Sequence, residues 1–262
     1  MKFGKSIAPA MLLAGLTWMP TDNAVAGSLK DEPIAAQIAP HYFRLEAGIA
    51  WSSIDKGTWV SPGGERGNWA FDDDRAFYGS IAVGRNLMRG VRGDLSFGMN
   101  RGQDYDGCHI PGGGGNVPDC GDASVSTSVD THLLLANLFI EPLELMGHGG
   151  SAIRPFVTVA AGVAWNDMDT WTRVSPDAYG SEIRNFSGNT ETNFAWAIGG
   201  GASIDLTRVF GRQAFLDFTY RYVDAGDARG GLKPDVGRGI PQEPLNFDVQ
   251  FHAVTAGVRV SF

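Results

Sequence analysis

The sequence predicts an all-β fold, an eight-stranded antiparallel up-and-down β-barrel that crosses a membrane. Apolar and polar residues alternate with a period of two in eight segments, and long and short connections alternate between those segments. An apolar stretch near the amino terminus has the features of an export signal. The composition, with 36 Gly and 11% aromatic residues, is typical of an exported one-domain β protein.

Residues 1–26 predict a cleaved secretory signal peptide. Lysines precede a short apolar stretch, and a triplet of small residues that ends at Ala26 provides the cleavage site. Later apolar runs are shorter than the roughly 18 residues that a membrane-spanning helix needs. Cleavage removes Lys2, Lys5 and Asp22, so 28 acidic and 19 basic residues remain. This excess of acid argues against nucleic acid as a partner.

The predicted strands divide the rest of the chain. Residues 27–40 have no periodic pattern and are expected to form a periplasmic leader, and residues 41–262 are expected to form the outer-membrane barrel domain. An even number of strands places both ends of the barrel domain on one side of the membrane. The strands are expected at about residues 41–51, 76–87, 90–100, 126–140, 153–165, 193–206, 213–224 and 247–262.

The connections fall into a long and a short class that alternate along the chain. Bacterial outer-membrane barrels have long extracellular loops and short periplasmic turns. We therefore expect the turns and both ends of the barrel domain to be periplasmic. The long connections, expected to be extracellular loops rich in Gly, Asp, Asn, Ser and Pro, are 52–75, 101–125, 166–192 and 225–246.

The two faces of each predicted strand differ in size and polarity. In the segment 153–165, valines alternate with Thr158, Ala160 and Gly162, and in other strands charges take the place of these small residues. A dry core cannot be built from glycines and unpaired charges, so lipid must meet the bulky face. A soluble lipocalin-like barrel, the alternative, has the opposite arrangement. Leu133 and its neighbouring leucines blur the fourth strand, whose register the sequence leaves open.

Four stretches resemble a known family: Arg-Gly-Asp-Leu-Ser-Phe at 92–97, Arg-Pro-Phe-Val-Thr-Val-Ala-Ala-Gly-Val-Ala at 154–164, Asp-Phe-Thr-Tyr-Arg-Tyr-Val-Asp at 217–224, and Ala-Gly-Val-Arg-Val-Ser-Phe at 256–262. The chain resembles small outer-membrane β-barrels of the OmpA/opacity-protein type, the porin-family surface antigens of Gram-negative bacteria. The resemblance implies an eight-stranded barrel in the cell outer membrane with variable extracellular loops. It does not imply one activity, and the cysteines of the second long connection depart from the family.

Charged residues on the inward faces predict a network inside the barrel. Four cations and four anions sum to zero, and an eight-stranded barrel is just wide enough for its own side chains to fill. We expect ion pairs that plug the lumen. The alternative is a narrow, gated pore whose charges select ions. The predicted network consists of Arg44, Glu46, Arg92, Asp94, Asp205, Asp217, Arg221 and Arg259.

Cys108 and Cys120 are the only two cysteines of the chain. Because the envelope is oxidising, we expect them to form one disulfide. A zinc site is not expected, since His109 is the only histidine nearby and three ligands are too few. The sequence predicts no metal and no cofactor.

Two clusters of charge lie in the long connections. In the first connection, Asp55, Glu65 and Asp72–Asp74 offer oxygen ligands for a divalent cation, but their spacing does not match a calcium loop, so a solvated acidic segment is expected. In the fourth, basic residues either meet lipopolysaccharide phosphates or are simply solvated. These residues are Arg229, Lys233 and Arg238.

A catalytic set is weakly indicated on the fourth strand. Ser126, Ser128, Asp130 and His132 share one face. Side chains two residues apart on a strand are about 7 Å apart, too far for direct proton transfer. We therefore expect no enzyme and no catalytic residues.

The last predicted strand ends on an aromatic residue, Phe262, which shares a face with Val258 and Val260. This pattern is expected to serve as a signal for the barrel assembly machinery. The function expected is structural support and surface display, with loops mediating adhesion to host-surface or matrix ligands, and with membrane lipid and lipopolysaccharide as further partners. The alternatives are a narrow gated porin and a lipid-modifying enzyme of the outer membrane.

Overall fold

The computed structural model describes residues 41–53, 56–72, 74–110, 118–147, 152–177, 180–235 and 239–262. The predicted signal peptide (1–26) and leader (27–40) lie outside the described residues. None of the helices in the described part of the chain is long and apolar enough to cross a membrane.

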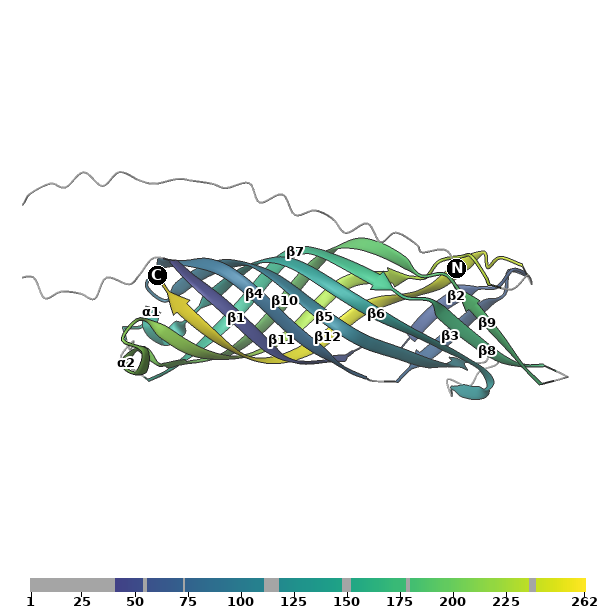
Figure 1. Ribbon diagram of the computed structural model, residues 1–262, viewed down its shortest axis with the longest axis horizontal. Coiled ribbons are helices and arrows are strands. Elements are labelled where there is room, and N and C mark those ends of the chain that lie inside the picture. The colour runs from purple at the N-terminus through teal and green to yellow at the C-terminus, as the bar shows by residue number, and fades with distance from the viewer. Residues whose placement is uncertain are drawn as a thin grey trace, which may run out of the picture. The chain divides into compact units, whose positions relative to one another are not determined.

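Eight antiparallel strands close into a ring, as the sequence predicts. Going round the ring, the order is β1, β4, β5, β6, β7, β10, β11 and β12, and β12 pairs with β1 to close it. The ring strands follow one another round the barrel in their order along the chain, which defines an up-and-down barrel (Figure 1). The ring strands are β1 (His41–Ser52), β4 (Arg75–Met88), β5 (Val91–Ile110), β6 (Asp119–Ile140), β7 (Ile153–Met168), β10 (Asn189–Asp205), β11 (Ala214–Arg229) and β12 (Glu243–Ser261).

Two short helices occupy the connections at one end of the barrel. These are α1 (Pro142–Leu145), between β6 and β7, and α2 (Thr207–Phe210), between β10 and β11. The tight turn between β4 and β5 lies at this end, where Gly90 takes a positive φ of 72°. Figure 1 shows the carboxyl terminus here as well. These are the short connections that the sequence assigns to the periplasm.

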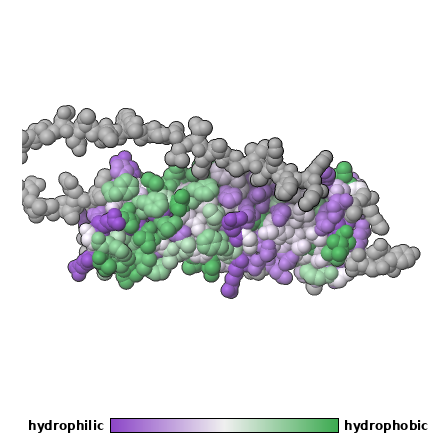
Figure 2. Space-filling view, in the orientation of Figure 1, coloured by the Kyte–Doolittle hydropathy of each residue, from purple (hydrophilic) through white to green (hydrophobic). Residues whose placement is uncertain are grey.

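An apolar belt surrounds this half of the barrel. Outward side chains such as Leu45, Ile81 and Val157 are about half exposed, although each is a large hydrophobic residue. Figure 2 shows hydrophobic side chains gathered on the half near the helices and hydrophilic ones toward the opposite end. An apolar surface of this kind is stable only against lipid. The soluble barrel alternative is therefore wrong, because its apolar faces would point inward.

The four long connections are expected to be loops, and this is wrong for most of their length, because strands continue well beyond the belt. β5, β6, β11 and β12 are extended, three further strands join their edges, and a fourth, β9, pairs with β8. β2 pairs with β12, β3 pairs with β5 and β8 pairs with β6. The added strands are β2 (Lys56–Val60), β3 (Arg66–Phe71), β8 (Trp171–Asp177) and β9 (Gly180–Phe186). We call this second level of the barrel the extension.

Two β-bulges mark the transition from the belt to the extension. Pairing shifts between Asn100 and Gln103 on β5, and between Asp224 and Asp227 on β11. Each bulge contains a glycine with positive φ, Gly102 at 70° and Gly226 at 72°. Because a bulge adds one residue, the inward-facing positions change from even to odd on β5 and from odd to even on β11.

Candidate functional site

The lumen within the belt holds a buried ion-pair network. Arg44 donates two hydrogen bonds to Asp94, from Nε at 3.0 Å and from Nη2 at 3.1 Å, and it also pairs with Glu46. The Tyr42 hydroxyl and the Asn137 amide donate to the same Asp94 carboxylate, at 3.1 and 2.8 Å. Asp94 thus accepts four hydrogen bonds, which compensates the burial of its charge.

A second group of charges lies beside the first. Arg259 donates to Asp217 from Nε at 3.0 Å and from Nη2 at 3.4 Å. The Nη2 of Arg92 lies 3.9 Å from the same carboxylate, and Arg92 also pairs with Glu141. Arg221 belongs to the first group, because its Nη2 lies 3.6 Å from Glu46. Tyr42 links the two groups, because its hydroxyl donates to Asp94 and its ring centre lies 5.6 Å from the Arg259 guanidinium.

Side chains from different walls of the barrel meet in this network. The Nη1 of Arg221, on β11, donates to Oδ1 of Asn137, on β6, at 3.3 Å. The guanidinium of Arg92 lies 4.3 Å from the ring centre of Phe139 and 5.0 Å from that of Phe156. Aromatic faces favour a cation that has been removed from water. The network therefore crosses the lumen and fills it with paired charges and rings.

The structure brings seven of the eight predicted network residues together and leaves one out. Asp205 is the last residue of β10, and its carboxylate accepts a hydrogen bond from the backbone N–H of Thr207 at 2.8 Å. It pairs with Arg154 at 3.1 Å, and both side chains are about a quarter exposed. Asp205 therefore lies at the periplasmic mouth.

The sequence reasoning missed Glu141, Asn137 and Phe139. All three lie at odd-numbered positions at the end of β6 or just beyond it, on the face that points into the lumen. Glu141 takes the place in the network that was predicted for Asp205. The alternation along β6 identifies these three positions as inward-facing only when its register is known, with Leu133 facing inward and Leu134 facing outward.

The extension contains a core of the opposite chemistry. Phe71, Tyr105 and Phe247 pack against one another, with ring centres 4.6–5.8 Å apart. Burial raises the pKa of the Tyr105 hydroxyl above its ordinary value. Aliphatic residues complete this core, and on the outer surface of the same strands Asp104 and Asp106 are exposed.

Nearer the tip, three aromatic residues form a continuous stack. Trp59 packs edge-on against Trp171 at 6.2 Å, and Trp171 stacks on Phe186 at 3.9 Å. Trp171 and Phe186 are almost fully buried, and Trp59 is 6% exposed. This stack ties β2 to the β8–β9 hairpin through the interior of the barrel.

Cys108 and Cys120 form a disulfide with their Cα atoms 4.5 Å apart. The bond joins the ends of β5 and β6 at the tip of the extension. Next to it, His109 pairs with Asp122 and packs on Trp69, with ring centres 5.4 Å apart. The disulfide thus braces the longest hairpin of the barrel.

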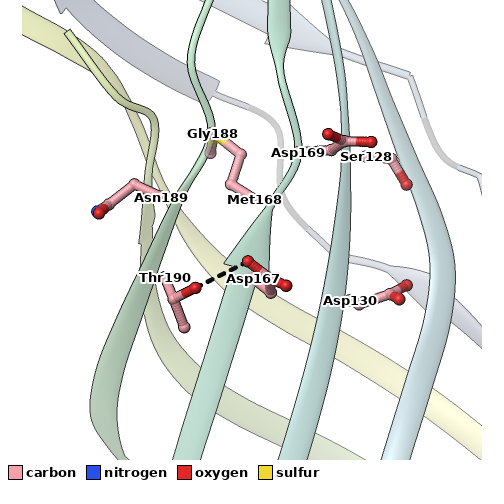
Figure 3. Close-up of a pocket in the computed structure, with 8 residues that line it drawn as sticks. All are labelled: Ser128, Asp130, Asp167, Met168, Asp169, Gly188, Asn189 and Thr190. Atoms are coloured by element: carbon pink, nitrogen blue, oxygen red, sulfur yellow. Dashed lines mark hydrogen bonds between the residues drawn. The ribbon is translucent and has the colours of Figure 1, made fainter. Parts of the chain in front are cut away.

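A pocket of about 520 Å³ opens on the outer wall above the belt, where β6, β7 and β10 run side by side (Figure 3). Its acidic side chains are already engaged. Asp167 accepts a hydrogen bond from Thr190 at 2.8 Å, and Asp130 accepts one from the backbone N–H of Gly102 at 2.8 Å. These contacts give the carboxylates a structural role in the wall.

The four residues of the weakly indicated catalytic set share the outward face of β6. Asp130 pairs with Arg101 at 3.4 Å, and the His132 ring stacks on Phe97 at 6.1 Å. Ser128 lines the outer-wall pocket, and Ser126 is exposed. The carboxylate and the imidazole therefore contact neighbours other than the serines.

The predicted charge clusters of the connections are only partly within the described residues. Asp55, Asp73 and Arg238 lie outside them. Across the described part of the chain, no group of three or more His, Cys, Asp or Glu side chains is arranged to hold a metal ion. Arg229 lies at the end of β11, where it lines a second pocket in the wall of the extension.

Phe262 lies on the outer surface at the periplasmic end. Its side chain is 70% exposed and stacks on His41, and its backbone N–H donates to the His41 carbonyl at 2.9 Å. Val258 and Val260 are on the same outward face of β12. The carboxyl terminus thus closes the ring against the first strand.

A closed eight-stranded ring, an apolar belt and a polar lumen together define a transmembrane β-barrel of the bacterial outer-membrane type. Aromatic and histidine rings border the belt on the side of the extension, where Trp51, Tyr220 and Tyr222 surround His252. Long connections face outward in such barrels, so the extension is extracellular.

No protein-family model matches the sequence, and no curated protein matches it. Among solved structures, the chain is similar to the neisserial surface protein NspA, with 14% identity, a TM-score of 0.40 and coverage of 84% of this chain and 97% of that one. It is similar to the outer membrane protein OprG of Pseudomonas aeruginosa, with 11% identity, a TM-score of 0.47 and coverage of 86% and 98%.

A third similar structure is Ail, the attachment invasion locus protein of Yersinia pestis. Its identity is 10%, its TM-score 0.34 and the coverage 84% of this chain and 99% of that one. Because these identities and scores are low, the class of the protein rests on its own ring of strands and apolar belt.

Proposed function

We propose that this protein is a surface-display barrel whose membrane-embedded half anchors the extension as an extracellular platform. The rim of this platform, formed by residues 61–65 and 240–243, makes adhesive contacts. The observation that supports this proposal is the core of the extension. A fully buried Phe side chain contributes about 1.5–3 kcal/mol, and the extension buries several aromatic residues above the membrane. Such a core holds the rim rigid and away from the membrane surface.

The rim contains exposed polar turns on this rigid support. In the β2–β3 turn, the backbone N–H of Ser61 donates to the Glu65 carbonyl at 2.8 Å, and the Glu65 N–H donates to Ser61 Oγ at 3.0 Å. Turns of this kind tolerate sequence change without loss of the scaffold, which suits them to recognition.

The test exchanges rim segments 61–65 and 240–243 for Gly-Ser sequences of equal length. A matched exchange of residues 207–211, at the periplasmic end, is the control. Barrel assembly is measured by the difference in gel migration between unheated and boiled samples, and function by attachment of expressing cells to immobilised matrix proteins and to host cells. We expect attachment to fall only in the rim variants. Unchanged attachment in both rim variants would contradict the proposal.

The lumen network supports a further part of the proposal, that the barrel does not serve as an open channel. Four arginines and four carboxylates fill the lumen as pairs, so an ion would have to displace a salt bridge to pass. Protein reconstituted in a planar bilayer should show only small and infrequent conductance. A steady, large conductance from the monomer would instead support the narrow-porin alternative.

We also propose that Phe262, Val258 and Val260 are read by the barrel assembly machinery. Their exposed outward face remains accessible after the ring has closed. Replacing Phe262 with Ala should lower the amount of assembled barrel in the membrane while leaving in vitro refolding intact. An equal loss in refolding would show that the residue acts through stability alone.

A further inference from the structure

Two arginines face each other inside the tip of the extension. Arg173 on β8 and Arg184 on β9 are Cα partners across the hairpin. Arg184 is 5% exposed, and Arg173 is half-buried. Like charges directly opposite each other destabilise an antiparallel pair, and burial increases their repulsion.

The two guanidinium groups differ from those of the lumen in their partners. Among the side chains that the structure describes, neither forms an ion pair, and the Nε of each has no hydrogen-bond partner. Arg173 donates to Ser175 Oγ at 3.0 Å, and Arg184 donates to the Gly239 carbonyl at 2.9 Å. Both acceptors are neutral, so they do not compensate the positive charge.

Two acids lie near the pair of arginines. Burial and the neighbouring Arg184 lower the pKa of Arg173, while Glu182 and Asp122 act in the opposite direction. Asp122 is held by His109. The two guanidinium groups thus face each other in a largely buried site, with Glu182 and Asp122 as their acidic neighbours.

Aromatic rings hold both guanidinium groups in place. Arg173 lies 4.9 Å from the ring centre of Trp59, and Arg184 lies 5.0 Å from that of Phe186. These two rings are the ends of the stack that passes through Trp171. Stacking fixes the plane of a guanidinium and leaves its edge, with several N–H groups, free to bind an oxyanion by two bonds.

We infer that Arg173 and Arg184 form a binding site for a phosphate or sulfate group that enters from the extracellular end of the barrel. A tetrahedral dianion matches the two adjacent cations in charge and offers oxygens to both. The biological use of the site rests on the proposed adhesive function, since the site lies just inside the rim. Binding itself is measured on the purified protein, independently of adhesion.

The test uses calorimetry to measure binding as inorganic phosphate or sulfate is titrated into the folded, full-length protein in detergent. We expect saturable binding that Arg173→Gln and Arg184→Gln each weaken about tenfold, the effect of losing one bidentate charged contact. Arg173→Lys keeps the charge but loses the fork, and binding should weaken by an intermediate amount. Arg66→Gln is the matched control, because Arg66 is an exposed arginine of the extension, 3.9 Å from Glu243.

Heat-dependent gel migration of each variant shows whether its barrel is folded. If the Arg66 and Arg173 variants weaken binding equally, the effect is one of surface charge and the inference is overturned. The absence of saturable binding to the wild-type protein would also overturn it. Sulfated dextran, with unsulfated dextran as control, distinguishes the sources of the anion. If sulfated dextran competes with the inorganic ions, the ligand of the site is a sulfate group carried on a glycan. If only the inorganic ions bind, the ligand is a free anion.

The two proposals can fail separately. If Arg173→Gln loses anion binding while cells attach normally, the assignment of the binding site stands, but the site has no part in adhesion. Normal attachment in the rim-exchange variants would contradict the display function without affecting the binding site.

Discussion

The two halves of this barrel are built from the same strands but have opposite interiors. Within the belt, Arg44 and Asp94 are buried inside while Leu45 and Leu95 are exposed on the outside. Below the two arginines at its tip, the interior of the extension is aromatic and aliphatic, and the exposed face carries residues such as Asp104. The same alternation of side chains serves both halves, with its polarity reversed.

The surrounding solvent accounts for this reversal. Lipid solvates apolar side chains, so the belt needs no apolar core and encloses the charges that lipid would exclude. Water surrounds the extension, which must bury apolar area as any soluble domain does. The bulges on β5 and β11 lie at the boundary, where each strand changes the face that it turns inward.

The largest expected effect comes from removing one charge of the lumen network. Asp94→Asn leaves Arg44 with Glu46 as its only carboxylate, and it should lower the free energy of unfolding by about 3–5 kcal/mol. Asp104→Asn, an exposed change on the same strand, should have little effect. Urea unfolding in detergent, followed by tryptophan fluorescence, measures both. Equal stability of the two variants would show that the lumen charges are not coupled.

A cavity in the core of the extension should have a comparable but local effect. Phe247→Ala removes a ring that packs on Phe71 and Tyr105, and should destabilise the extension by about 3–4 kcal/mol. Protease cleavage in the extension should increase, while the ring of strands within the belt stays resistant. Ile183→Ala, at an exposed side chain, is the control. A collapse of both halves together would show that they fold as one unit.

The external faces of the two halves should respond differently to the same new charge. Val157→Arg places a cation in the apolar belt and should cost about 2–4 kcal/mol. Asn68→Arg, on the outward face of the extension, should be nearly neutral because water solvates it. The comparison is made by refolding into lipid vesicles. Equal costs at the two positions would place the belt boundary elsewhere.

The smallest expected effect concerns two carboxylates of the extension. Asp227 and Asp248 are opposite each other on β11 and β12, and burial together with the hydrogen bond and charge of Asp227 raises the pKa of Asp248 above its ordinary value of 3.8. The contribution of this group to stability is therefore fully present below that value and is lost as pH rises through the raised pKa.

Asp248→Asn should remove this pH dependence and stabilise the extension near neutral pH by about 0.2–0.5 kcal/mol, because both side chains are largely exposed and screened. Stability measured against pH for the wild type and the variant provides the test. A variant that keeps the full pH dependence would assign it to other groups.

The sequence was sufficient for the barrel but not for the extension. Alternation placed all eight ring strands, because lipid imposes one rule on every outward position within the belt. It failed above the belt for two reasons. The extra residue at each bulge shifts the period on β5 and β11, and the added strands β2, β3, β8 and β9 are short and rich in the residues of turns.

The same limit applies to the candidate sites. The alternation of inward and outward positions predicts seven of the lumen charges. It does not show that Glu141, just after β6, points into the lumen, because this requires the register of the leucines on β6. Arg173 and Arg184 lie in the segment 166–192, for which the composition predicts a loop. Their significance depends on being opposite each other across a hairpin, a relation that spacing along the chain does not express.

Hydrogen exchange of the reconstituted protein tests the central claim most directly, namely that a second level of barrel stands above the membrane. Backbone N–H groups in β2, β3, β8 and the extended part of β5 should be protected from exchange, because they are paired in a sheet with an aromatic core. Phe247→Ala should release that protection and leave β1 and β4 protected. Rapid exchange throughout these segments in the wild-type protein, with protection confined to the belt, would contradict the account.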